Sequence, residues 1–244
     1  AMGITGTEVS KDAAAMILTD DNFATIIKAV ANGRNVYKNI KNAILFLLSG
    51  NMAGILAVLY TSLAALPVPF QPVHLLFINL LTDSLPALAI GMEPAERDVL
   101  SEKPRNPKGG ILERRFMALL LGQGALIAVC TMISFEVGLK ESAALASTMA
   151  FATLTLARLF HGFNCRSRHS IVKIGFRRNR YSLGAFALGV LLLALVLFVP
   201  ALKPLFEVET MNGMQLGCVG VMAVLPTFVI QNFKVVGEVF DREK

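Results

Sequence analysis

The sequence predicts an all-α membrane protein: a bundle of six transmembrane helices, with a long cytosolic helix in front of the first. Three observations predict this fold class. Hydrophobic residues make up 55% of the chain and charged residues 16%, and the mean hydropathy is +0.61. Six apolar segments recur, each close to the roughly 20 residues that a helix needs to cross hydrocarbon. Basic residues collect in alternate connections between these segments, as is typical of membrane proteins.

Residues 1–22 are polar and too few to fold alone, so we expect the last strand and helix of a larger domain. The short apolar run 15–18 fits a buried strand by its length, although a helix is equally allowed. Asp20, Asp21 and Asn22 then supply the side chains that start a new helix.

From Phe23 onward, apolar residues recur at helical spacing, and no proline interrupts the chain before Pro67. The pattern predicts one helix of about 40 residues, with residues 23–42 as a cytosolic stalk roughly 30 Å long. The alternative is two helices that are broken near Gly33. The remainder, residues 43–244, is the predicted transmembrane domain. Its predicted spans are residues 43–66, 73–91, 116–137, 145–163, 181–199 and 214–233.

The placement of basic residues predicts the orientation. The connection after the fourth span holds six basic residues and no acid, whereas the opposite connections hold only Lys140 and Lys203. Lysine and arginine favour the cytoplasmic side, so both termini are expected in the cytoplasm. The net charge of +6 indicates contact with a lipid leaflet and not with nucleic acid.

The second predicted span contains an acid. A carboxylate at bilayer depth costs at least roughly 2.5–3.5 kcal/mol, so Asp83 is by default a functional residue. Asn79, Thr82 and Asp83 stand at i, i+3 and i+4, which places them on one face of an α-helix. Pro86 has no N–H, so the carbonyl of Thr82 loses its helical partner. Amide, hydroxyl, carboxylate and free carbonyl together predict an oxygen cage for a hard cation.

The three cysteines and three histidines are scattered over the chain without the spacing of metal ligands. We expect the cysteines to be small apolar residues and expect no zinc site.

Two motifs carry a resemblance to a known family. The stretch from Gly6 through Phe23 resembles the end of the phosphorylation domain of P-type cation pumps, and residues 75–86, LLFINLLTDSLP, resemble their sixth transmembrane helix in its calcium-pump version. The chain is similar, from residue 1 to about 235, to the C-terminal membrane half of a bacterial calcium-transporting P-type ATPase. The resemblance implies that residues 1–22 are a remnant of the α/β phosphorylation domain and that the six spans are the fifth to tenth of the family.

The resemblance also implies a ligand set. Asn79 and Asp83 would coordinate calcium, with Thr82 in the same shell, and Asn51 matches a position that supplies an amide oxygen in two-calcium members. Asn51 also lies between Gly50 and Gly54, so it is equally open to the interpretation that it bonds across a close helix contact.

Two carboxylates of the family are missing. Gly54 stands where two-calcium members have a glutamate, and Arg158 replaces an optional one. We therefore predict one calcium per cycle, with Arg158 filling the vacated site as a counter-charge. Two other roles stay open for Arg158: it snorkels to lipid headgroups, or it pairs with Asp83 for structure alone.

The family's phosphorylated aspartate lies in a D-K-T-G motif, which this sequence lacks. ATP and Mg²⁺ would therefore bind in domains outside this chain, and its partners would be that N-terminal remainder of the pump and the lipid bilayer. The implied location is a bacterial plasma membrane, with proton counter-transport.

Other readings stay open at this point. The chain is alternatively a stand-alone six-helix cation channel or secondary transporter, or a non-catalytic membrane anchor that assembles with a separate N-terminal piece. The same fold also serves manganese or sodium pumps, and Mn²⁺ accepts oxygen ligands much as calcium does.

Overall fold

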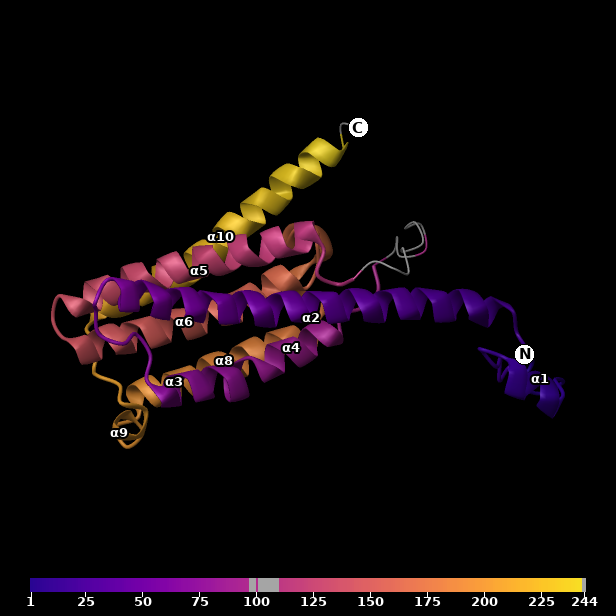
Figure 1. Ribbon diagram of the computed structural model, residues 1–244, viewed down its shortest axis with the longest axis horizontal. Helices are drawn as coiled ribbons and strands as arrows, with labels where there is room; N and C mark the ends of the chain where they lie inside the picture. The colour runs from indigo at the N-terminus through magenta and orange to yellow at the C-terminus, as the bar shows by residue number, and fades with distance from the viewer. Residues whose placement is uncertain (97–99, 101–109, 243–244) are drawn as a thin grey trace.

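A computed structural model describes residues 1–96, 100 and 110–242 of the chain, with side chains described as far as 240. Within these residues the fold is helical and has six helices, or helix groups, that are long and apolar enough to cross a membrane. They lie side by side in a bundle, and the first of them extends farthest beyond it (Figure 1). The predicted fold class of an all-α membrane bundle is confirmed.

The extended helix is α2, Ala24–Leu63. Its N-cap residue is Phe23, which makes no side-chain cap bond. One residue earlier, Asn22 Oδ1 accepts a hydrogen bond from the backbone N–H of Ala24 at 2.9 Å, so the predicted side chain takes part in the helix start from just outside the cap position. The helix runs through Gly33 without a break, so the single-helix prediction is correct and the two-helix alternative is wrong. Its first half lies outside the bundle, and its second half packs against α5 and α4 (Figure 1).

The N-terminal segment contains α1, Glu8–Ala13, and no strand. Residues 15–18 form only an isolated parallel bridge, between Met2 and Leu18. A strand needs neighbouring strands to satisfy its backbone along its length, and the described residues supply one bridging partner. Of the four residues only Leu18 is buried.

The second span is built of three helical pieces: α3, Pro72–Leu76; η1, Phe77–Thr82; and α4, Ser84–Gly91. The other spans are α5, Arg114–Leu139; α6, Ala143–Cys165; α8, Arg180–Phe198; and α10, Gly213–Arg242. Where the structure describes the connections, they contain the short helical turns α7, Ile171–Ile174; η2, Phe176–Arg178; and α9, Lys203–Phe206.

Helix α6 forms the centre of the bundle. In its most apolar stretch 78% of residues are buried, against 28–50% in the other spans. It packs against α2, α5, α8 and α10. It is therefore surrounded by protein and not by lipid, and this allows it to carry polar side chains such as Thr153, Arg158 and His161.

Candidate cation site

The second span changes its helical register just before Asp83. Residues Phe77–Thr82 form a π-helix, in which the N–H of Asp83 donates to the carbonyl of Ile78, five residues back, at 2.9 Å. The local sequence favours this change. Thr82 Oγ1 donates to the Ile78 carbonyl at 3.0 Å, and Pro86 offers no N–H to the Thr82 carbonyl. Single π-turns inside membrane helices frequently accompany functional sites.

Asp83 forms a buried ion pair with Arg158 of α6. The guanidinium Nη2 donates to Asp83 Oδ2, and the two side chains are 2% and 4% exposed. The same Nη2 donates to Asn51 Oδ1 of α2 at 3.1 Å. Three helices thus meet at one arginine nitrogen. The alternative that Arg158 snorkels to lipid headgroups does not fit this buried geometry. Asn51 bonds across the contact between α2 and α6, as the second interpretation of this residue expects. Its ligand role stays a prediction.

Glycine residues in α2 shape the space around the guanidinium. A Cβ atom on Gly50 would stand 2.7 Å from Cζ of Arg158, closer than real Cβ contacts, so the arginine lies against bare backbone. Around Gly54, one turn further on, a Cβ would meet nothing within 4 Å. The position that carries a glutamate in the implied family pattern is therefore open here.

Two polar atoms of the ion pair have no partner among the described residues: Asp83 Oδ1 and Arg158 Nε. A buried polar atom without a hydrogen bond is costly, and such atoms in native proteins call for an explanation. Oδ1 is an oxygen with free lone pairs, which is what a hard cation requires of a ligand. The donor set at this point is therefore compatible with a calcium-like ion bound by Asp83.

The structure brings together Asn51, Asp83 and Arg158, whereas Asn79 differs from Thr82 and Asp83 in its exposure. Thr82 and Asp83 are buried, but the Asn79 side chain is exposed on the surface of this chain. The expected shared face of residues 79, 82 and 83 assumed α-helical geometry. A π-helical turn holds more residues than an α-helical one, so side chains three apart, such as Asn79 and Thr82, diverge more than in an α-helix, whereas side chains four apart, such as Asn79 and Asp83, stay on one side. The proposed ligand role of Asn79 stays a prediction.

A second buried ion pair, which the sequence did not reveal, joins α4, α6 and α8 at the bundle end where α2 emerges. Arg166 Nε and Nη2 donate to the two oxygens of Glu93 at 2.8 and 3.0 Å. Asn179 Nδ2 donates to the same carboxylate at 2.8 Å, and Asn39 of α2 donates to the Glu93 carbonyl at 2.8 Å. Arg166 was predicted only as one of six basic residues in a connection. No local pattern separates it from its exposed neighbour Arg168, since only the fold supplies Glu93.

His161 lies at the centre of a buried polar seam one turn from Arg158. Its Nε2 is 2.9 Å from Ser49 Oγ and 3.2 Å from Cys165 Sγ, while Nδ1 is 3.3 Å from Asn164 Nδ2. Nowhere in the described part of the chain do three His, Cys, Asp or Glu side chains converge as metal ligands. The seam therefore ties α2 to α6.

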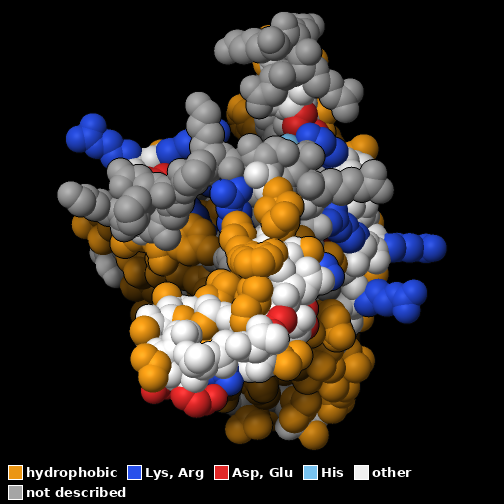
Figure 2. Space-filling view, turned by 90° about the vertical axis from the view of Figure 1, so that its right-hand side faces the viewer, with side chains coloured by type: hydrophobic (Ala, Val, Ile, Leu, Met, Phe, Trp, Pro, Cys, Tyr) orange, Lys and Arg blue, Asp and Glu red, His pale blue; other side chains and the backbone are white. Residues whose placement is uncertain are grey.

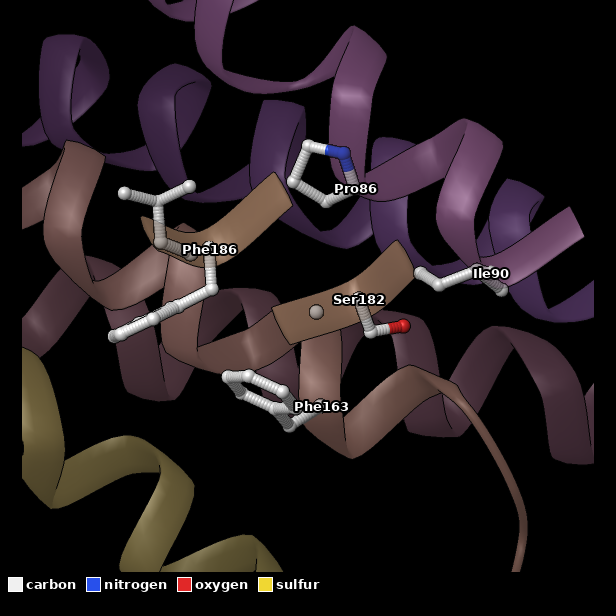
Figure 3. Close-up of a pocket in the computed structure, with 7 residues that line it drawn as sticks. Pro86, Ile90, Phe163, Ser182 and Phe186 are labelled. Atoms are coloured by element: carbon white, nitrogen blue, oxygen red, sulfur yellow. The ribbon is translucent and has the colours of Figure 1, made fainter. Parts of the chain in front are cut away.

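A small cavity lies beside Pro86, between α4, α6 and α8 (Figure 3). Its volume is about 10 Å³, enough for about one water molecule. Pro86 and the rings of Phe163 and Phe186 surround it, and the Pro86 ring is 3.5 Å from where a Cβ on Gly162 would be. The lining is mostly apolar, so this cavity gives the helix break room and does not bind an ion.

Comparisons with known proteins agree with these features. The family "Cation transporting ATPase, C-terminus" matches residues 67–236. The chain is 42% identical over 232 residues to a calcium-transporting ATPase of Bacillus subtilis, which covers 94% of this chain and 26% of that protein. It is 41% identical to calcium-transporting ATPase 1 of Lactococcus lactis, over 99% of this chain and 28% of that protein. It is 37% identical to calcium-transporting ATPase type 2C member 2 of the rat, over 88% of this chain and 23% of that protein. The chain thus spans about a quarter of the length of these relatives.

Proposed function

Since this chain belongs to the cation-transporting ATPases, of which it matches the C-terminal region, we propose that it is the membrane half of a pump that exports calcium through an aspartyl-phosphate cycle. The observation that carries the proposal is Asp83: a buried carboxylate at a break in a membrane span, with one oxygen unpartnered. Relatives named calcium-transporting ATPases support calcium as the transported ion.

The proposed ligands are Asp83, Asn79, Thr82 and Asn51. Asp83 supplies the negative charge, and the other three supply neutral oxygens, which is the mixture that calcium accepts. Further ligands would come from the part of the pump outside this chain. The exposed side chains of Asn79 and Asn51 are open to such neighbours.

Arg158 limits the site to one ion. Two cations at a few Å separation repel strongly in a low-dielectric interior, and the guanidinium fills the space between Asp83, Asn51 and Gly50. We propose that Arg158 is a permanent counter-charge in the place of a second calcium. When calcium binds at Asp83 Oδ1, Arg158 keeps its contact with Asn51.

The long helix α2 is the proposed mechanical link. It is continuous from Ala24 to Leu63 and so reaches from the N-terminal segment to Asn51. We propose that residues 1–22 belong to a phosphorylation domain, that residues 23–42 form a stalk, and that residues 43–244 form the transmembrane domain. ATP and Mg²⁺ would act in domains outside the chain, and protons would move in the opposite direction.

The proposed location is a bacterial plasma membrane with both termini in the cytoplasm. The support is the charge asymmetry between the two ends of the bundle, because basic residues favour the cytoplasmic side. On this orientation, the Glu93–Arg166 pair lies at the cytoplasmic end and Tyr60 with Glu136 at the outer end, where their side chains are joined at 2.9 Å.

ATP-driven ion uptake by the full-length pump in sealed vesicles tests the proposal, with calcium, manganese and sodium offered separately. We expect calcium to activate ATP hydrolysis and to be transported, with one ion bound per pump. Loss of an outer-shell partner already costs roughly 10–100-fold in metal affinity, so Asp83→Asn, which changes a direct ligand, should cost at least as much.

The matched control is Glu136→Gln, which neutralises a carboxyl group in a different span and should leave calcium affinity unchanged. Activation by manganese or sodium alone would reassign the cargo. Two calcium ions bound with positive cooperativity would refute the role given to Arg158. Ion flux through this chain without ATP would favour a channel.

A further inference from the structure

The connection between α6 and α8 lies at the membrane boundary. It starts after Cys165, where α6 ends, and reaches α8 at Arg180. Both helices have the length of a membrane span, so the residues between them are held at the depth of the lipid headgroups.

This connection is fixed in place by contacts at both of its sides. The backbone N–H and the hydroxyl of Ser170 donate to the Glu238 carboxylate of α10, at 2.6 and 2.8 Å. The N–H of Ile171 donates to Gln231 Oε1 at 2.9 Å. On the other side, the Arg178 guanidinium donates to the Ala95 carbonyl after α4. The surface that the connection presents is therefore organised before any ligand binds.

The exposed charge on this connection has one sign. No acid occurs between residues 166 and 180. Arg168, Lys173, Arg177 and Arg180 are exposed, and none of them forms an ion pair with a described residue. Lysine and arginine side chains project from this end of the molecule (Figure 2). Lys173 Nζ lies 3.2 Å from His169 Nδ1, but none of the four cations is neutralised by an ion pair within the described part of the chain, so they are available to an anionic ligand.

Large apolar side chains stand between these cations. Val172 is 88% exposed, Phe176 49% and Tyr181 60%. The interfacial zone of a bilayer favours this combination of apolar, aromatic and basic side chains in one connection.

We propose that residues 168–181 form a preformed platform that binds anionic phospholipid headgroups. Arg168, Lys173, Arg177 and Arg180 contact the headgroup oxygens, and Val172, Phe176 and Tyr181 enter the interfacial layer. Guanidinium groups suit phosphate oxygens because they offer several N–H donors in one plane. The platform rests on the six spans alone, so it holds whichever ion the pump carries and whichever leaflet this end meets.

Lipid-quenching fluorescence tests the platform in the full-length pump. This chain has no tryptophan, so Val172→Trp adds one reporter, and its signal is the difference between the variant and the parent protein. The vesicles are phosphatidylcholine that contains either brominated phosphatidylglycerol or brominated phosphatidylcholine as quencher. We expect quenching by both lipids, with a several-fold preference for phosphatidylglycerol.

Charge variants of the reporter protein then separate a site from a general charge effect. Each cation near an anionic surface contributes a preference of up to roughly five-fold, so Arg168→Gln with Arg177→Gln should remove most of the phosphatidylglycerol preference. The matched control, Lys140→Gln with Lys203→Gln, removes the same charge at the opposite end and should leave the preference unchanged.

Three results would overturn the proposal: equal quenching by the two lipids, no quenching by either because protein covers the reporter, or equal effects of the two charge variants. If the double arginine variant does not fold, sodium chloride titration of the reporter protein replaces it. Salt screens headgroup contacts, so a preference that salt leaves intact would also overturn the platform.

Discussion

Gly50 and Arg158 lie in direct contact where α2 passes α6. A Cβ atom at residue 50 would stand 2.7 Å from Cζ and 2.8 Å from Nη2 of the arginine. The missing side chain is thus the space through which the guanidinium reaches Asp83 and Asn51. A glycine in a membrane helix usually brings two backbones close together; this one admits a charged side chain.

Gly50→Ala is expected to displace Arg158 and to destabilise the bundle. Alanine is intrinsically better than glycine in a helix by about 1 kcal/mol, but overpacking a filled site costs about 1–3 kcal/mol. Gly54→Ala is the matched control, because it has the same intrinsic gain and open space around the new methyl group. In thermal unfolding in detergent, the midpoint temperature of Gly50→Ala should be lower than that of Gly54→Ala. Equal midpoints would contradict the packing argument.

Asp83 and Arg158 should be strongly coupled in a double-mutant cycle. Removing one partner of a buried pair leaves an uncompensated charge and costs about 3–5 kcal/mol, whereas removing both costs much less. We expect Asp83→Asn and Arg158→Met each to destabilise the protein, and the double variant to be more stable than the sum predicts, although it does not transport. Tyr60→Phe with Glu136→Gln gives a cycle on an exposed hydrogen-bonded pair, where a much smaller coupling is expected because solvent screens the contact. Additive effects at Asp83 and Arg158 would show that the two charges do not stabilise each other.

Arg166 and Arg168 are two residues apart and should differ sharply on substitution. Arg166→Met removes both bonds to the buried Glu93 carboxylate and is expected to cost about 3–5 kcal/mol. Arg168→Met changes an exposed side chain and should stay within about 0.5 kcal/mol. Unfolding free energies of the two variants in detergent check this. A small effect of Arg166→Met would mean that water replaces the arginine at Glu93.

The N-terminal segment should open as the pH falls from about 4 to about 2. The backbone N–H groups of Ile4 and Thr5 donate to the Asp21 carboxylate at 2.9 and 2.8 Å. The bond from Ile4, followed by the Thr5 side chain, lowers the pKa of Asp21 from 3.8 to about 2. Because the folded pKa lies below the unfolded one, the stabilisation is complete above the unfolded pKa and is lost as the pH falls through the folded pKa.

Hydrogen exchange of the peptide 1–22 measures this opening. Exchange at Ile4 and Thr5, corrected for the intrinsic pH dependence, should rise below pH of about 4 in the parent protein. In Asp21→Asn, exchange at Ile4 and Thr5 should be fast at every pH, with no step near pH of about 4. A step of the same size in that variant would assign the opening to another group.

The six spans were predictable because their cause is local. A helix that crosses hydrocarbon must be apolar over its whole length, so composition in a window identifies it whatever its neighbours are. The continuity of α2 followed in the same way from the absence of proline between residues 24 and 63. The observed ends of the spans differ from the predicted ends by a few residues, and α10 continues to Arg242. The reason is that polar residues can extend a helix beyond the hydrocarbon.

The sequence by itself determined the all-helical membrane fold, the break near Pro86 and the identification of Asp83 as a functional residue. Each of these depends on the cost of polar groups in hydrocarbon. Only the tertiary structure decided which partners those groups have. The Asp83–Arg158 and Glu93–Arg166 pairs join residues 75 and 73 positions apart. The π-helical register of Phe77–Thr82 depends on how that span packs. Pairing across helices is a property of their relative placement, and no window of sequence contains it.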